Sequence, residues 1–142
     1  MATITADLVE GYQIEITNGR HSWRADEPVD VGGADTGPNP YELLLGAVAA
    51  CTCITVSMYA QRKGITLDSI SVQYSHAKVH ADDCEICDDE AAGFIDTVEA
   101  QLFIEGTFTE AQRARLHEVA HRCPVRKTLE RGVTFGDDVY VG

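Results

Sequence analysis

Five cysteines are the residues with which this sequence could do the most chemistry, at positions 51, 53, 84, 87 and 123. An odd number in a chain of 142 residues is not the framework of a small secreted disulfide scaffold. The N-terminus has neither the basic region nor the apolar run of a signal peptide, so we expect a cytoplasmic protein. In a reducing compartment, cysteines serve as core residues, metal ligands or reactive thiols.

Cys51 and Cys53 both fall within an apolar segment that we interpret as a helix over residues 41–62. A cysteine on such a helix is typically a small core residue. Because the two side chains are about 200° apart around a helix, they cannot act together. We interpret Cys53 as a core residue.

Cys123 has a different setting, because Pro124 follows it and suits the first position of a new helical turn. Free backbone N–H groups and the dipole at a helix N-terminus stabilise a thiolate. Arg122, Arg126 and Lys127 add positive charge at this point of the sequence. The pattern is compatible with a reactive thiol and with a packed one.

Cys84 and Cys87 have the Cys-x2-Cys spacing of zinc ligands, and His76 and His80 precede them. On a regular strand the two histidines would lie roughly 13 Å apart, so both can bind one ion only if the strand bends near His80. A zinc site, a redox-active pair and two plain loop thiols therefore all remain open.

The elements that must position these residues form one α+β domain over residues 1–142, with antiparallel sheets around a central buried helix. Alternating apolar and polar residues predict strands, and 3.6-residue periodicity or caps predict helices. The expected elements are two or three strands within 2–24, a loop over 25–40, the helix 41–62, a hairpin of 67–80 and 94–105 around an acidic loop, a helix opened by a capping box at 109–112, and a strand near 133–141.

The charge of −12, from 11 basic and 23 acidic residues, disfavours nucleic acid and anionic membranes as partners. Residues 43–60 carry no charge and reach the lower limit for a membrane span. Several Thr, Ser and small residues interrupt this run, so we expect a buried helix and no membrane. His117 and His121 have a ligand-compatible spacing, but we expect them at a solvated rim.

Three motifs together resemble the OsmC/Ohr family: Gly37-Pro-Asn-Pro-Tyr-Glu-Leu-Leu-Leu, Ala49-Ala-Cys51-Thr, and Cys123-Pro-Val125 with Thr128-Leu129. Ala25-Asp-Glu-Pro, Gly32-Gly and the Asp83-Cys84-x-x-Cys87 loop resemble an OsmC-like subgroup that carries this cysteine pair. The resemblance implies an intertwined homodimer with active sites at the subunit interface.

The resemblance also implies thiol-dependent reduction of organic hydroperoxides without a required cofactor. Cys51 would be oxidised to a sulfenic acid, and Cys123 would condense with it to a disulfide that a dithiol or lipoyl donor reduces. Arg24, or else Arg20, would activate the thiolate. Tyr41 stands where peroxidase members usually carry Glu, and Glu42 follows as the candidate carboxylate. The alternative is a non-catalytic protein that binds a small apolar ligand or zinc at the dimer cleft.

Overall fold

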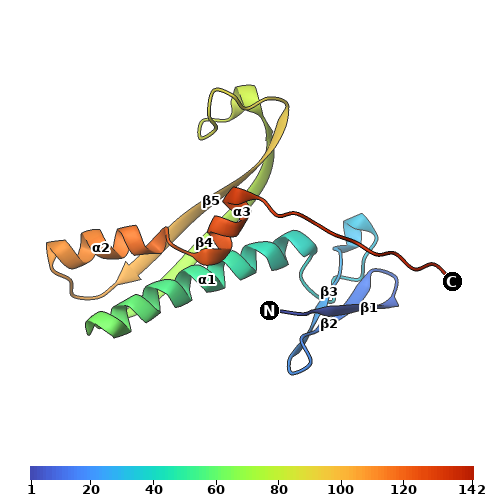
Figure 1. The fold of residues 1–142 in the computed structure, drawn as a ribbon, viewed down its shortest axis with the longest axis horizontal. Coiled ribbons are helices and arrows are strands. Elements are labelled where there is room, and N and C mark those ends of the chain that lie inside the picture. The colour runs from blue at the N-terminus through green and yellow to red at the C-terminus, as the bar shows by residue number, and fades with distance from the viewer. The chain divides into compact units, whose positions relative to one another are not determined.

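The computed structural model describes residues 1–142 and contains five strands and three α-helices (Figure 1). The chain forms two compact units. The first comprises residues 1–46 and 76–97, and the second comprises residues 47–75 and 98–142. One long helix, α1 (Pro40–Lys63), and the two long strands each contribute residues to both units.

The N-terminal part of the first unit is a three-stranded antiparallel sheet of β1 (Thr5–Glu10), β2 (Gln13–Thr17) and β3 (Ser22–Ala25). Short turns at residues 11–12 and 18–21 connect its strands, and these are the places where the alternation of apolar and polar residues is interrupted. The predicted strands and turns of residues 2–24 are confirmed. The register of β2 and β3 places Glu15 opposite Arg24.

The loop after β3 is folded around a buried carboxylate. Asp26 is 2% exposed and accepts hydrogen bonds from the backbone N–H groups of Glu27, Ala34 and Thr36 and from the Thr36 hydroxyl. The Thr36 hydroxyl contributes most to lowering the pKa of Asp26, with the backbone donors adding to it against the effect of burial.

Two glycines let the backbone of this loop approach itself closely. A Cβ at Gly33 would lie 1.8 Å from the Glu27 carbonyl oxygen, and a Cβ at Gly37 would lie 2.5 Å from that of Arg24. Both distances are far below any van der Waals contact, so these positions require glycine. The loop expected over residues 25–40 is therefore a defined structure with a short 3₁₀ turn at Val29–Val31.

Helix α1 begins after Asn39, whose side-chain oxygen accepts from the Glu42 N–H while the Glu42 carboxylate accepts from the Asn39 N–H. Its four buried residues lie at i, i+4 spacing and form one stripe: Val48, Thr52, Val56 and Ala60. The expectation of a helix buried on all sides is wrong for the single chain, since Ile54 and Met58 are more than half exposed. Helix α1 is long and apolar enough to cross a membrane. The core helices of soluble proteins can have the same length and composition.

The two long strands β4 (Ser69–His80) and β5 (Phe94–Glu105) pair with each other. Backbone hydrogen bonds join Asp68 to Glu105 and Ala81 to Gly93, so the strands are antiparallel, as predicted. The loop between them contains a 3₁₀ turn, Ala81–Asp83, followed by Cys84 and Cys87.

The core of the second unit forms where α1 meets α2 (Glu110–Ala120). The predicted capping box is confirmed, because the Thr109 and Gln112 side chains each accept from the other residue's N–H. The buried residues are Val56, Leu116, Val119 and Ala120, against which Tyr59, Leu67, Ile70, Leu102, Ile104 and Phe108 pack.

The C-terminal end of the chain consists of α3 (Pro124–Arg131) and an extended segment of residues 132–142. The strand predicted near 133–141 is not formed, although the alternation that suggested it is present. A strand needs a neighbour for its backbone groups, and this segment has none in the single chain. Phe135 and Tyr140 are consequently more than four-fifths exposed.

Candidate active site

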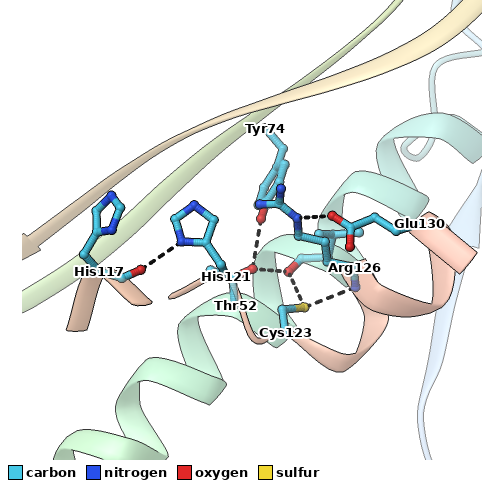
Figure 2. A network of polar contacts seen from close by, with 8 residues as sticks. Thr52, Tyr74, His117, His121, Cys123, Arg126 and Glu130 are labelled. Carbon is cyan, nitrogen blue, oxygen red and sulfur yellow. Dashed lines mark hydrogen bonds and ion pairs between the residues drawn. The ribbon is translucent and has the colours of Figure 1, made fainter. Parts of the chain in front are cut away.

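Cys123 is the N-cap residue of α3, as its position before Pro124 predicts. The side chain is fully buried, and its Sγ accepts a hydrogen bond from the Arg126 N–H at 3.4 Å. Figure 2 shows this bond between Cys123 and Arg126. The Cys123 Sγ is also 3.8 Å from the Val48 carbonyl oxygen of α1. The sulfur therefore lies at the positive end of a helix dipole, where a thiolate is stabilised.

Thr52 and Tyr74 connect α1 to β4 beside this sulfur (Figure 2). The Thr52 hydroxyl is fully buried, donates to the Val48 carbonyl oxygen at 3.0 Å and lies 3.0 Å from the Tyr74 hydroxyl. The same carbonyl thus contacts Thr52 and Cys123. Every buried polar side-chain atom has a hydrogen-bond partner, so this network is fully satisfied.

Cys51 is half-buried on α1 and is a free thiol, like Cys53 and Cys123. Its Sγ is 4.0 Å from the hydroxyl oxygen of Thr55, and that hydroxyl donates to the Cys51 carbonyl at 2.7 Å. Cys53 shares none of these contacts, as the angle between the two cysteines on a helix requires.

Cys51 and Cys123 influence each other's ionisation directly. Burial raises the pKa of Cys51, and the neighbouring Cys123 raises it further. Burial alone would also raise the pKa of Cys123, but the neighbouring Cys51, the Arg126 N–H and the nearby Thr52 lower it below its ordinary value. Each thiol is thus close enough to shift the pKa of the other, and a negative charge on the pair is more stable at Cys123 than at Cys51.

This charge distribution differs from the one that the sequence led us to expect. We expected a cation to lower the pKa of Cys51, but no cation is among the groups that shift it. Arg24, the predicted activating residue, is an exposed residue of β3 and contacts Glu15 and Gln13, each at 3.5 Å. Glu42 caps α1 through Asn39.

Tyr41 lies in a small cluster within the first unit. Its ring stacks on that of His76 with a centroid distance of 4.4 Å, and His76 Nε2 is 2.8 Å from the Asp96 carboxylate. The Tyr41 ring therefore packs against the aromatic ring of His76.

The four predicted zinc ligands do not converge on one point. Cys84 and Cys87 are joined by a disulfide, which leaves no thiolate for a metal. His76 is bound to Asp96, whereas His80 contacts Asp82 and the ring of Phe94. No group of three or more His, Cys, Asp or Glu residues is arranged to hold a metal ion. Zinc binding stays a prediction for the reduced loop.

Residues 32–136 match the family model described as OsmC-like protein. That range is more than half of the chain and includes Cys51, Cys84, Cys87 and Cys123. The chain belongs to the OsmC-like family. No curated protein matches the sequence.

Solved structures share the fold of this OsmC-like chain at low sequence identity. An OsmC-like protein from Mycoplasma pneumoniae has 22% identity and a TM-score of 0.68, over 92% of this chain and 87% of the other. An organic hydroperoxide resistance protein from Elizabethkingia anophelis has 23% identity and a TM-score of 0.62, over 89% and 86% of the two chains. The organic hydroperoxide resistance protein OsmC of Legionella pneumophila has 21% identity and a TM-score of 0.61, over 89% and 87%.

Sequence reasoning missed two contributors to the OsmC-like site, Thr52 and Tyr74, and one helix cap. Thr52 directly follows Cys51, but the sequence does not show which buried partners its hydroxyl meets. Tyr74 could not be found, because its contact with Thr52 spans 22 residues. The capping role of Glu42 had a readable signal, since Asn39 and Glu42 have the spacing of a capping box. His117 and His121 are exposed, as expected, and His121 Nδ1 contacts the His117 carbonyl.

Proposed function

We propose that this OsmC-like protein reduces organic hydroperoxides with the thiols of Cys51 and Cys123. The observation that carries the proposal is that these two free thiols lie close enough to shift each other's pKa, with Cys123 at the N-terminus of α3. Family membership and structural neighbours that are organic hydroperoxide resistance proteins support it.

The half-buried Cys51 is the thiol that meets the substrate, because Cys123 is fully buried. The Cys51 thiolate attacks one peroxide oxygen, the O–O bond breaks, and the alkoxide leaves as the alcohol after taking a proton. Cys51 is now a sulfenic acid. Cys123 attacks its sulfur, forming the disulfide and releasing water. A dithiol or lipoyl donor then supplies two electrons and two protons to restore both thiols.

Cys123 makes the first step possible although the pKa of Cys51 is raised. Because the pKa of Cys123 is lowered, its thiolate form is the acceptor that takes the Cys51 proton as the peroxide arrives. The Arg126 N–H bond and the helix dipole set how readily Cys123 accepts it.

We also propose that the protein works as a homodimer in the cytoplasm, where thiol donors are available. Two exposed apolar surfaces support the dimer. One is the open side of α1 with Ile54 and Met58, and the other is the C-terminal segment with Phe135 and Tyr140. Exposed apolar surface of this kind is typical of an interface. Sedimentation at micromolar concentration tests this: a monomer contradicts it, and truncation after Gly132 is expected to weaken the dimer.

The activity is tested by steady-state consumption of cumene hydroperoxide and hydrogen peroxide with dihydrolipoamide as donor. We expect preference for the organic peroxide and complete loss of turnover in Cys51→Ser. Cys53→Ser is the matched control, two residues away on the same helix, and should keep the parent rate. Cys123→Ser should form a sulfenic acid that dimedone traps, without a disulfide. Equal turnover in Cys51→Ser and the parent would refute the assignment.

One observation favours a non-catalytic alternative. In the single chain the pKa of Cys51 is raised, mainly by burial, so the thiol is neutral at rest. A neutral thiol among exposed apolar residues suits the binding of a small apolar ligand. Absence of turnover with lipoyl and simple dithiol donors alike would favour this function.

A further inference from the structure

The loop that joins β4 to β5 carries a second pair of sulfurs, which the proposed peroxidase does not use. We call residues 81–93 the acidic loop (Figure 1). Its disulfide joins Cys84 and Cys87, whose Cα atoms are 5.5 Å apart, and both residues are half-buried. Between them, Glu85 and Ile86 are exposed, Ile86 by 63%. The disulfide therefore lies at a surface that a second molecule can reach.

The loop does not need this disulfide to hold its shape. The Ala81 N–H donates to the Gly93 carbonyl at 2.7 Å and closes the base, and the Cys84 N–H donates to the Ala81 carbonyl. The crosslink spans a sequence separation of only three residues and connects no two elements. Because the stabilisation from a crosslink grows with the loop it closes, its contribution here is near the minimum. Exposed disulfides with little structural role are the ones that exchange with thiols.

The charge around this disulfide restricts which thiols can attack it. Residues 82–90 contain six carboxylates, and no Lys or Arg occurs between Lys78 and Arg113. The basic side chain next to the loop in the sequence, His80 at the end of β4, is already paired with Asp82. Exchange begins with attack by a thiolate. A strongly negative surface repels an anionic thiol and raises the local concentration of a cationic one.

We propose that Cys84–Cys87 is a thiol–disulfide exchange site that accepts electrons from dithiols with positive charge next to the reactive sulfur. The attacking thiolate forms a mixed disulfide with one loop sulfur, and the other loop sulfur leaves as a thiolate and takes a proton. The donor's second thiol then attacks the mixed disulfide and releases the first loop sulfur. Two electrons and two protons pass from the dithiol to the loop, and the donor becomes a disulfide. The proposed exchange uses neither Cys51 nor Cys123.

The test isolates the loop disulfide in the full-length Cys51→Ser/Cys53→Ser/Cys123→Ser variant, in oxidised form. Its reduction is followed by alkylation and mass spectrometry with two monothiol probes, cationic cysteamine and anionic 2-mercaptoethanesulfonate. The rate at which each probe reduces the loop disulfide is divided by the rate at which the same probe reduces a neutral reference compound, hydroxyethyl disulfide. This ratio corrects for the intrinsic reactivity of the two thiols. At low salt we expect a preference for cysteamine of about tenfold or more. The preference should shrink towards one at about 0.5–1 M salt, where charges are screened.

A charge-neutralised loop separates the proposal from other causes. Asp83→Asn/Glu85→Gln/Asp89→Asn removes half of the six carboxylates, and none of these three side chains forms a hydrogen bond or ion pair. We expect the preference to fall several-fold. Asp7→Asn/Glu10→Gln/Asp30→Asn is the matched control outside the loop and should leave it unchanged.

Two results would overturn the proposal. One is a disulfide that neither probe reduces under conditions that reduce the reference compound. The other is an unchanged preference in the neutralised loop. Mass spectrometry of the loop peptide from the unsubstituted chain gives the same readout if the triple serine variant does not fold. Peroxide turnover is not involved, so failure of the peroxidase proposal leaves this test intact.

Discussion

Cys123 has two roles that substitution can separate, because its sulfur caps α3 and its thiol shifts the pKa of the neighbouring Cys51. Serine keeps a side-chain acceptor at the N-cap position but removes the thiol, whereas alanine removes both. In Cys123→Ser the hydroxyl can still accept from the Arg126 N–H and donate to the Val48 carbonyl, the two contacts that the sulfur makes. We therefore expect Cys123→Ser to be about as stable as the parent.

Cys123→Ala should be less stable than Cys123→Ser by about 1–2 kcal/mol. Loss of an N-cap side chain typically costs about 1 kcal/mol. The position is fully buried, so water cannot replace the missing acceptor and the Arg126 N–H becomes unsatisfied, which moves the cost to the upper part of the range. With an m-value of about 2 kcal/mol/M, the urea midpoint of Cys123→Ala should be lower by roughly 0.5–1 M.

The measurement is urea unfolding of the parent and both variants under reducing conditions and at equal protein concentration. Equal concentration matters because the stability of a dimer depends on it. Both variants should lose the peroxide-induced disulfide, whatever their stability. If Cys123→Ala unfolds at the same urea concentration as Cys123→Ser, the capping role is refuted.

Three further predictions concern single contacts. In a double-mutant cycle by urea unfolding, Thr52→Val and Tyr74→Phe should couple by about 0.5–1.5 kcal/mol, since their hydroxyls bond each other; additive effects would contradict the bond. Folding lowers the pKa of Asp26 from its ordinary 3.8, so the ionised carboxylate stabilises the protein fully above that pH and progressively less as the pH falls through the folded-state pKa. The difference in the free energy of unfolding between the parent and Asp26→Asn should therefore become smaller between pH 7 and pH 3. Glu42→Ala should lower the free energy of unfolding by about 0.5–1 kcal/mol through loss of the helix cap, while Glu42→Gln loses less.

The parts of the fold that the sequence predicts are those set by neighbouring residues. Thr109 and Gln112 are three residues apart, and their capping box needs no other part of the chain. Cys123 is the N-cap residue because proline disfavours helical geometry at the residue before it and is itself favourable at the first helical position, N1. The β4–β5 hairpin follows from alternation on both sides of one loop.

The parts that could not be predicted depend on partners distant in the sequence. An apolar helix is predicted as buried, but only packing decides which residues of α1 are covered, and the single chain covers the Val48–Ala60 stripe alone. The C-terminal segment has the alternation of a strand, yet a strand exists only when another strand accepts its hydrogen bonds. Both differences leave apolar surface exposed, which is why they support a second copy of the chain.

The location of the charge in the thiol pair sharpens the question of activation. An arginine beside Cys51 would stabilise the thiolate on the attacking sulfur itself. In the single chain the stabilising groups, the Arg126 N–H and the α3 dipole, act on Cys123. A cation or hydrogen-bond donor that a partner subunit placed near Cys51 would favour the thiolate at Cys51 over the thiolate at Cys123. In the proposed homodimer such a group should shift thiolate character to Cys51, and reactivity towards peroxide should then increase with dimer concentration rather than with chain concentration.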